Sequence, residues 1–143
     1  MKSIGSRENR WMNDINHCIT EALVDKYGEN TLFVLEDLTN VRATTEKVHI
    51  NNRYTSVSWS FYQFRQLLEY KAQMIKSIVI TVNPKYTSQM CPKCGHIEKS
   101  SRDKKNHIFK CKNCSYQSND DRIGAMNLWR KGIEYIESNS KEV

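Results

Sequence analysis

The sequence has no long apolar segment. No run of apolar residues in its 143 positions approaches the roughly 20 residues that a helix needs to cross a lipid bilayer. The first ten residues, Met1 to Arg10, also lack the apolar centre of a secretory signal peptide. Hydrophobic residues make up 38% of the chain, which is enough for one domain with a modest core. We therefore expect a cytoplasmic protein with no membrane partner.

A disulfide framework is also lacking. The chain has five cysteines, and an odd number in a cytoplasmic protein argues against a set of disulfide bonds. Four of them form two C-x2-C pairs, whereas Cys18 stands apart. Because no second soft ligand lies at a suitable spacing, we interpret Cys18 as a small buried hydrophobic side chain.

Only two stretches have the composition of buried strands, Thr31–Leu35 and Ser77–Val82. Helical periodicity predicts three helices, over residues 7–27, 60–75 and 121–136. The alternation of helices and strands is typical of an α/β protein with parallel strands. Two strands are too few for a stable parallel sheet. The polar segment from Thr39 to Val57 is predicted to be a long loop.

Apolar spacing also predicts the buried faces of the helices. The first helix is expected to bury Trp11, Ile15, Cys18 and Ala22. The last helix is expected to bury Met126, Trp129, Ile133 and Ile136.

The formal net charge is +6, and part of it is concentrated in one segment. Between Cys91 and Cys114 there are seven basic residues and two acidic ones, Glu98 and Asp103. The basic residues are Lys93, Lys99, Arg102, Lys104, Lys105, Lys110 and Lys112. A basic segment favours a polyanion partner such as nucleic acid, but a solvated, lysine-rich loop accounts for much of the same pattern.

The two C-x2-C pairs give the most specific motif, C-x2-C-x16-C-x2-C. Tetrahedral thiolate sites of this kind bind structural Zn²⁺, and each pair supplies two ligands from one tight turn. The ligands are Cys91, Cys94, Cys111 and Cys114. Four thiolates close the coordination shell, so we expect neither His96 nor His107 to be a ligand and no catalytic role for this zinc. Ile108, Phe109 and Tyr116 are expected to form a small apolar patch.

Two carboxylates occupy positions suited to chemistry. Glu36 follows the first predicted strand, and ligands of α/β sheets collect at the carboxyl ends of strands. Asp121 falls in the first turn of the last predicted helix, where the helix dipole favours an ionised carboxylate of the kind that Mg²⁺ prefers. Both residues could equally end a strand or cap a helix, and the pattern does not decide between these interpretations.

Five motifs occur in an order that resembles a known family. They are V-L-E-D-L (34–38), Y-K-A (70–72), V-N-P-K-Y-T-S-Q-M-C-P-K-C-G (82–95), F-K-C-K-N-C (109–114) and D-R-I-G-A-M-N-L (121–128). Together they resemble the C-terminal half of the TnpB/OrfB proteins of insertion sequences, which are transposon-encoded, RNA-guided DNA nucleases related to type V CRISPR effectors. The match covers nearly the whole chain, from Arg7 to about Ile136.

The resemblance implies an α/β fold, an incomplete RNase H-like (RuvC) domain with an inserted four-cysteine zinc ribbon. The nuclease part would comprise residues 1–84 and 118–143, and the ribbon residues 85–117. The family site is an Asp, Glu and Asp that hold divalent metal. Glu36 matches the middle carboxylate and Asp121 the last, so both would bind Mg²⁺ in a completed site.

The sequence departs from the family pattern in three places. Ile123 and Gly124 replace the usual Asn and Ala, which leaves Asp120 as a possible alternative register for Asp121. Ser115 replaces a common Gly in the second cysteine pair. Most importantly, the strands that carry the first catalytic Asp have no match, and Asp14 cannot replace it because Asp14 lies in a predicted helix.

Three hypotheses follow from this pattern. The chain is a truncated C-terminal part of a TnpB-like endonuclease, inactive alone, with DNA and guide RNA as partners and Mg²⁺ bound only when the site is complete. It would then dock a missing N-terminal fragment or self-associate through an open strand edge. Alternatively, it is a non-catalytic nucleic-acid-binding module that uses the basic ribbon, or a remnant without function.

Overall fold

The computed structural model describes residues 2–38 and 59–140. The loop expected between Thr39 and Val57 therefore lies outside the described residues. The chain divides into two compact units, one made of Met1–Phe33 and Leu38–Ile80 and the other of Val34–Asp37 and Thr81–Val143. None of the helices in the described ranges is both long enough and apolar enough to span a bilayer.

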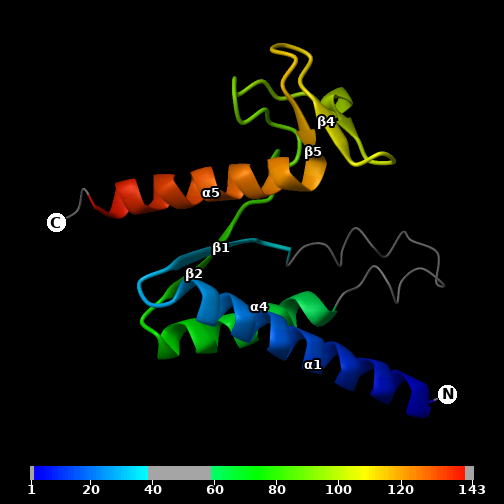
Figure 1. Cartoon of the computed structure of the whole chain (residues 1–143), viewed down its shortest axis with the longest axis vertical. Helices are drawn as coiled ribbons and strands as arrows, with labels where there is room; N and C mark the ends of the chain where they lie inside the picture. Colours follow the sequence, from blue (N-terminus) through cyan, green and yellow to red (C-terminus); the bar gives the residue numbers. More distant parts are fainter. Residues whose placement is uncertain (1, 39–58, 141–143) are drawn as a thin grey trace. The chain divides into compact units, whose positions relative to one another are not determined.

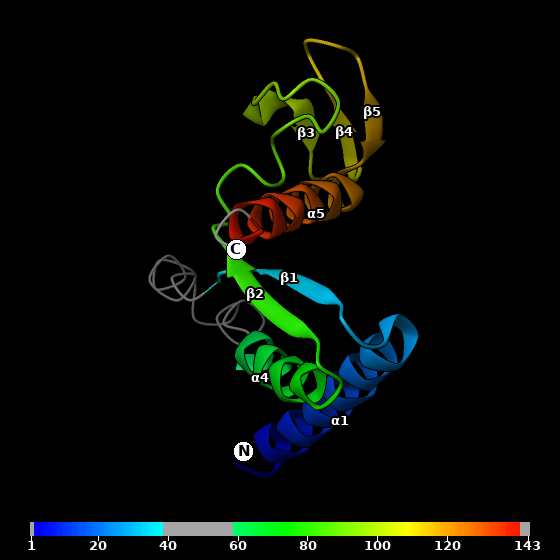
Figure 2. The same cartoon turned by 90° about the vertical axis from the view of Figure 1, so that its left-hand side faces the viewer.

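Two helices pack side by side in the first unit (Figures 1 and 2). Helix α1 runs over Lys2–Tyr27 and helix α4 over Trp59–Met74. Their buried apolar side chains are Val24, Leu68 and Ala72. Helix α1 begins before the expected Arg7. It ends at Tyr27 and is followed by Gly28, whose φ of 69° suits glycine and whose N–H donates to the carbonyl of Val24.

The buried face of α1 differs from the predicted one. Trp11 is 62% exposed and Cys18 is exposed, whereas the polar residues Asn16 and Thr20 are buried. The reason is a set of polar contacts. Gln63 of α4 accepts a hydrogen bond from Asn16 Nδ2 at 3.1 Å, and Thr20 Oγ1 donates to the Asn16 carbonyl at 2.7 Å. The apolar spacing predicted the wrong buried face of α1, because polar side chains that hydrogen-bond to one another and to the backbone are buried there instead.

The two predicted strands pair with each other. Strand β1 is Leu32–Glu36 and strand β2 is Ile78–Val82, and they form a two-stranded sheet. Ile78 N donates to the Thr31 carbonyl and Asp37 N donates to the Val82 carbonyl, so the strands run in the same direction. This confirms the parallel α/β pattern. Glu36 is the last residue of β1, at its carboxyl end.

The second unit combines an antiparallel ribbon with a long helix (Figure 1). The three strands of the ribbon are β3 (Arg102–Asp103), β4 (Ile108–Lys110) and β5 (Gln117–Asn119), with a 3₁₀ turn, η1 (Lys99–Ser101), before them. Helix α5 follows directly and runs over Asp120–Asn139. The Asn119 side chain caps it by accepting from the N–H groups of Asp121 and Arg122.

A small core joins the ribbon to α5. It contains Cys91, Phe109, Cys111 and Ile123, with Tyr116 partly buried against it. Of the predicted apolar patch, Phe109 is fully buried and Tyr116 lies at the edge of this core, but Ile108 is 39% exposed because it faces away on the same short strand.

The predicted buried stripe of α5 was wrong. Trp129 is 69% exposed and Ile136 is 51% exposed, while Met126 and Ile133 are half-buried. The buried positions of the helix are Asp120, Ile123, Asn127 and Gly132. The stripe is displaced because the ribbon packs on the first turns of the helix, and because Asp120 and Asn127 are buried through hydrogen bonds that apolar spacing does not detect.

Two substitutions in α5 distinguish these two faces. Ile123→Ala should lower the free energy of unfolding by about 2–5 kcal/mol, because it leaves a cavity in the core shared with Phe109. Trp129→Ala should change it by no more than about 0.5 kcal/mol, because the indole is exposed. Urea unfolding of the zinc-loaded proteins, followed by circular dichroism, measures both. Equal losses for the two variants would show that the stripe had been assigned to the wrong face.

Candidate metal centre and carboxylate site

Two loops of the same design carry the four cysteines. In the first, Cys91 N donates to the His96 carbonyl and Gly95 N donates to the Cys91 carbonyl. In the second, Cys111 N donates to the Tyr116 carbonyl and Ser115 N donates to the Cys111 carbonyl. The fifth residue of each loop has positive φ, 75° at Gly95 and 57° at Ser115. Ser115 thus adopts the left-handed conformation that glycine supplies in the first loop.

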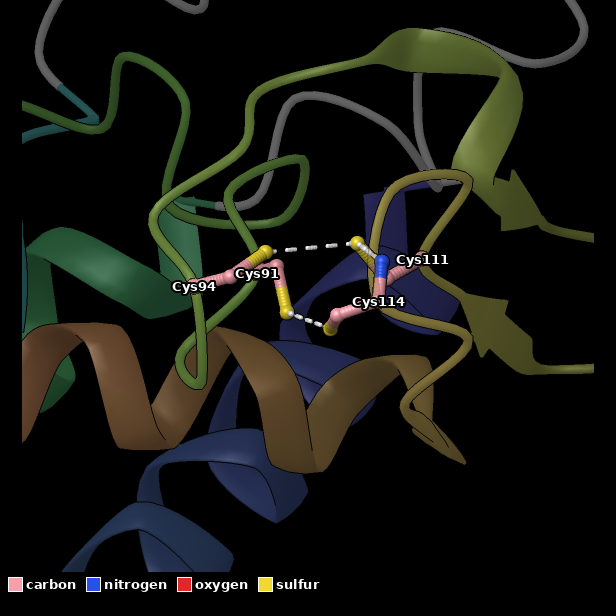
Figure 3. Close-up of side chains that lie close together, drawn as sticks. All are labelled: Cys91, Cys94, Cys111 and Cys114. Carbon is pink, nitrogen blue, oxygen red and sulfur yellow. Dashed lines mark hydrogen bonds between the residues drawn. The ribbon is translucent and has the colours of Figure 1, made fainter.

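The loops bring the four sulfur atoms together (Figure 3). Cys91 Sγ lies 3.6 Å from Cys114 Sγ, and Cys94 Sγ lies 3.6 Å from Cys111 Sγ. All four atoms lie within 4.8 Å of one another. A tetrahedral Zn²⁺ with Zn–S bonds of 2.3 Å requires sulfur atoms about 3.8 Å apart, so the cluster fits a metal ion such as zinc.

The thiols differ in acidity, as expected for sulfur atoms in contact. The backbone N–H of His96 lowers the pKa of the Cys94 thiol to about 6. At Cys114 the backbone N–H of Tyr116 acts in the same direction, but burial and hydrogen bonds to the neighbouring thiols prevail and raise the pKa to about 12. Metal binding requires all four sulfur atoms to be deprotonated, and a bound cation would neutralise the four adjacent thiolates.

Neither histidine joins the sulfur cluster in the described part of the chain. His96 Nε2 pairs with Glu98 Oε2 at 3.1 Å. His107 Nδ1 lies 3.3 Å from Oδ1 of Asp120, the first residue of α5. The expectation of an all-cysteine ligand group agrees with this geometry.

The adjacent aspartates of α5 have different environments. Asp120 is 1% exposed, and its carboxylate accepts from Arg102 Nε at 2.7 Å. The hydrogen bond from Arg102 holds the pKa of Asp120 below its usual value. Asp121 is 76% exposed at its side chain, with His107 Nδ1 4.0 Å from its Oδ2. Asp120 thus forms a buried ion pair that connects β3 of the ribbon to the start of α5. This favours the exposed Asp121 as the residue available to a ligand.

Glu36 is held by a residue that the sequence did not single out. Its Oε1 accepts a hydrogen bond of 2.6 Å from Thr87 Oγ1, and Thr87 is 3% exposed. Asn127 Nδ2, on α5, donates to the Thr87 carbonyl at 2.7 Å and to the Met90 carbonyl at 2.9 Å. A continuous set of hydrogen bonds therefore connects the end of β1 with the helix that begins at Asp120 and Asp121.

Thr87 and Asn127 lie inside two of the family-like motifs, Y-T-S-Q-M and D-R-I-G-A-M-N-L. A polar residue within such a motif, away from the cysteines and carboxylates, is the signal that could have identified them. Glu36 itself belongs to neither group of three or more potential ligands that the described residues place within 4.8 Å. Asp121 does belong to one, with His107 and Asp120.

A cavity of about 540 Å³ opens on the ribbon side of the second unit. It is lined by Ser88, Gln89, Lys99, Arg102, Asp103 and Lys104. Three of the seven basic residues between Cys91 and Cys114 thus gather around one cavity. Among the described residues, Lys99 and Lys104 form no ion pair, so their charge remains available to an anion.

Removal of the metal should unfold the ribbon. A zinc-loaded chain should contain one ion. A strong chelator should move the amide NMR signals of Phe109 and Ile123 to random-coil positions, because the sulfur cluster closes their shared core. The signals of Leu68 and Ala72 in the first unit should persist. Cys18→Ser is the matched control and should retain one zinc, whereas Cys91→Ser should lose it. A chelated chain with unchanged ribbon signals would contradict a structural metal.

The chain resembles proteins of one group in every comparison. Residues 61–128 match the family model described as Cas12f1-like, TNB domain. The CRISPR-associated endodeoxyribonuclease Cas12f1 of Sulfoacidibacillus thermotolerans is 36% identical over 124 residues, which are 85% of this chain and 27% of that protein. A TnpB-like protein of Methanocaldococcus jannaschii is 33% identical over 135 residues, 92% of this chain and 46% of that protein.

Solved structures share the fold. The cryo-EM structure of a Cas12f1–sgRNA–target DNA complex aligns with a TM-score of 0.67 at 21% identity, over 89% of this chain and 36% of that one. CasPhi-2 (Cas12j) bound to crRNA and phosphorothioate-DNA aligns with a TM-score of 0.66 at 21% identity, over 90% of this chain and 19% of that one. The chain thus spans less than half the length of these proteins. By sequence and fold together, it is a TnpB-type relative of the type V CRISPR effectors.

Proposed function

We propose that the chain forms the C-terminal part of an RNA-guided DNA endonuclease with an RNase H-like (RuvC) active site. Glu36 and Asp121 supply two of the three carboxylates, and the third comes from a segment outside residues 1–143. The observation that carries the proposal is the hydrogen-bonded connection from Glu36 through Thr87 to Asn127 on α5, the helix that presents Asp121. Without the third carboxylate the chain is inactive alone.

The two carboxylates suit a divalent ion in different ways. Glu36 is the last residue of β1. The N–H of the next residue, Asp37, donates to the Val82 carbonyl of β2, so the backbone at Glu36 is fixed. Asp121 lies in the first turn of α5 with its side chain 76% exposed, so its carboxylate is accessible to an ion. Glu36 and Asp121 would hold Mg²⁺, which would supply the charge that activates a water and stabilises the leaving oxygen on a DNA phosphate.

The four cysteines serve a different purpose. We assign Zn²⁺ to them because four thiolates in a tetrahedral arrangement match its preferred coordination. A closed shell leaves no position for substrate, so this ion stabilises the ribbon and takes no part in cleavage.

Nucleic acid is the proposed partner of the basic cavity. The Cas12f1 structure that this fold resembles is a complex with sgRNA and target DNA. Lys99, Arg102 and Lys104 around the cavity could contact phosphate groups, because lysine and arginine side chains supply most of the backbone contacts in such complexes. The same cavity supports a second candidate function, that of a non-catalytic nucleic-acid-binding module.

Complementation tests the nuclease proposal. The chain is mixed with the N-terminal part of a TnpB-like relative that contains the first catalytic Asp, together with its guide RNA and matching target DNA. Cleavage should appear only when both parts and Mg²⁺ are present. Glu36→Gln and Asp121→Asn should each reduce the rate at least about 100-fold, because each removes an ion ligand. Asp14→Asn is the control, since Asp14 is exposed on α1, and should cleave at the wild-type rate.

DNA and RNA binding by the same variants separates the two candidates. Binding that falls steeply with salt, survives both carboxylate changes and is lost in Cys91→Ser, with no cleavage in any mixture, would replace the nuclease proposal by the binding module. Cleavage by Glu36→Gln at the wild-type rate would also contradict the nuclease proposal. Absence of both cleavage and binding would indicate a remnant without function.

A further inference from the structure

We propose that Thr87 is a positioning residue that fixes the Glu36 carboxylate for divalent-ion binding. The inference rests on the proposed function, because it assumes that Glu36 is an ion ligand. It assigns a role to a side chain that lies outside both the cysteine cluster and the carboxylates.

The contact between the two side chains is short and partly buried. Thr87 Oγ1 lies 2.6 Å from Glu36 Oε1, within the range of hydrogen bonds from a hydroxyl to a charged carboxylate. The hydroxyl is also 2.9 Å from the Pro84 carbonyl, but it has a single proton. The ionised carboxylate is the stronger acceptor and lies closer, so it takes the proton. Because Thr87 is 3% exposed, little water competes with this bond.

The backbone of Thr87 is itself fixed from the opposite side. Asn127, which is fully buried, donates one amide proton to the Thr87 carbonyl and the other to the Met90 carbonyl. Thr87 N also faces the Pro84 carbonyl at 3.3 Å, which closes a turn. The Thr87 hydroxyl therefore has little freedom, and it can transmit the position of α5 to Glu36.

This arrangement restrains one oxygen of the carboxylate and leaves the other for an ion. Among the described residues, Glu36 Oε2 accepts no hydrogen bond. Asp121 precedes Asn127 by six residues, or about 9 Å along α5. Thr87 thus connects the strand that carries one proposed ligand to the helix that carries the other, and a metal site requires its ligands to be held in advance in the binding geometry.

The rotamer of Glu36 in the metal-free chain provides the direct test. Side-chain scalar couplings measured by NMR should report a single Glu36 rotamer in the wild type and in Thr87→Ser, which keeps the hydroxyl. Thr87→Val, of nearly equal shape, should give averaged couplings, and Thr87→Ala should repeat that result with a smaller side chain. Thr20→Val is the matched control, because Thr20 is a buried threonine whose hydroxyl, among the residues that the structure describes, bonds within α1. Unchanged Glu36 couplings in both Thr87→Val and Thr87→Ala would overturn the inference.

Mn²⁺ binding by the chain complemented with the N-terminal part of the TnpB-like relative, followed by electron paramagnetic resonance, separates this inference from the proposed function. Thr87→Val should weaken Mn²⁺ binding several-fold, Glu36→Gln should weaken it more, and Thr87→Ser and Thr20→Val should match the wild type. Equal Mn²⁺ affinity for the wild type and Glu36→Gln would contradict the proposed function, and with it the inference. A loss in Glu36→Gln without a loss in Thr87→Val would leave the proposed function standing and overturn the role of Thr87.

Discussion

The two hydrogen bonds donated by the Asn127 side chain are the contacts on which the second unit depends. One reaches the Thr87 carbonyl and the other the Met90 carbonyl, and Asn127 is fully buried. Met90 directly precedes the first metal ligand, and Thr87 holds Glu36. One buried amide therefore sets the position of both the cysteine cluster and a proposed catalytic carboxylate relative to α5. A buried N–H donor is costly to leave without an acceptor, so the two bonds of Asn127 Nδ2 keep the segment in place.

The ribbon and the helix stabilise each other at two further points. The core of Phe109 and Ile123 supplies apolar contact, and the ion pair of Arg102 with buried Asp120 fixes the start of α5. The helix begins where the ribbon ends, at the Asn119 cap. The first turn, which carries Asp121, is therefore held by this cap, by the ion pair of Asp120 and by the core around Ile123. In this account the metal acts indirectly: it stabilises the ribbon, and the ribbon orders the helix start.

The sequence predicted the elements whose signals are local. The cysteine spacing predicted the sulfur cluster, and β-branched composition predicted both strands to within a residue. The buried faces of α1 and α5 were not predictable from apolar spacing, because Asn16, Thr20 and Asn127 are buried through hydrogen bonds to distant or backbone groups. The contact of Thr87 with Glu36 was not predictable from the sequence either, because the two residues are 51 positions apart. The ion pair that gives Asp120 a different environment from Asp121 was not predictable either, because its partner Arg102 lies on a separate strand.

The central claim is that Glu36 and Asp121 serve the same divalent-ion site. Paramagnetic broadening by Mn²⁺ tests it directly, with the side-chain carboxyl signals of the two residues followed by carbon-detected NMR in the zinc-loaded chain complemented with the N-terminal part. Both signals should broaden over the same range of Mn²⁺ concentration, and Asp121→Asn should remove the broadening at Glu36. Broadening of one carboxylate alone, or of Glu36 to the same extent in Asp121→Asn, would contradict it.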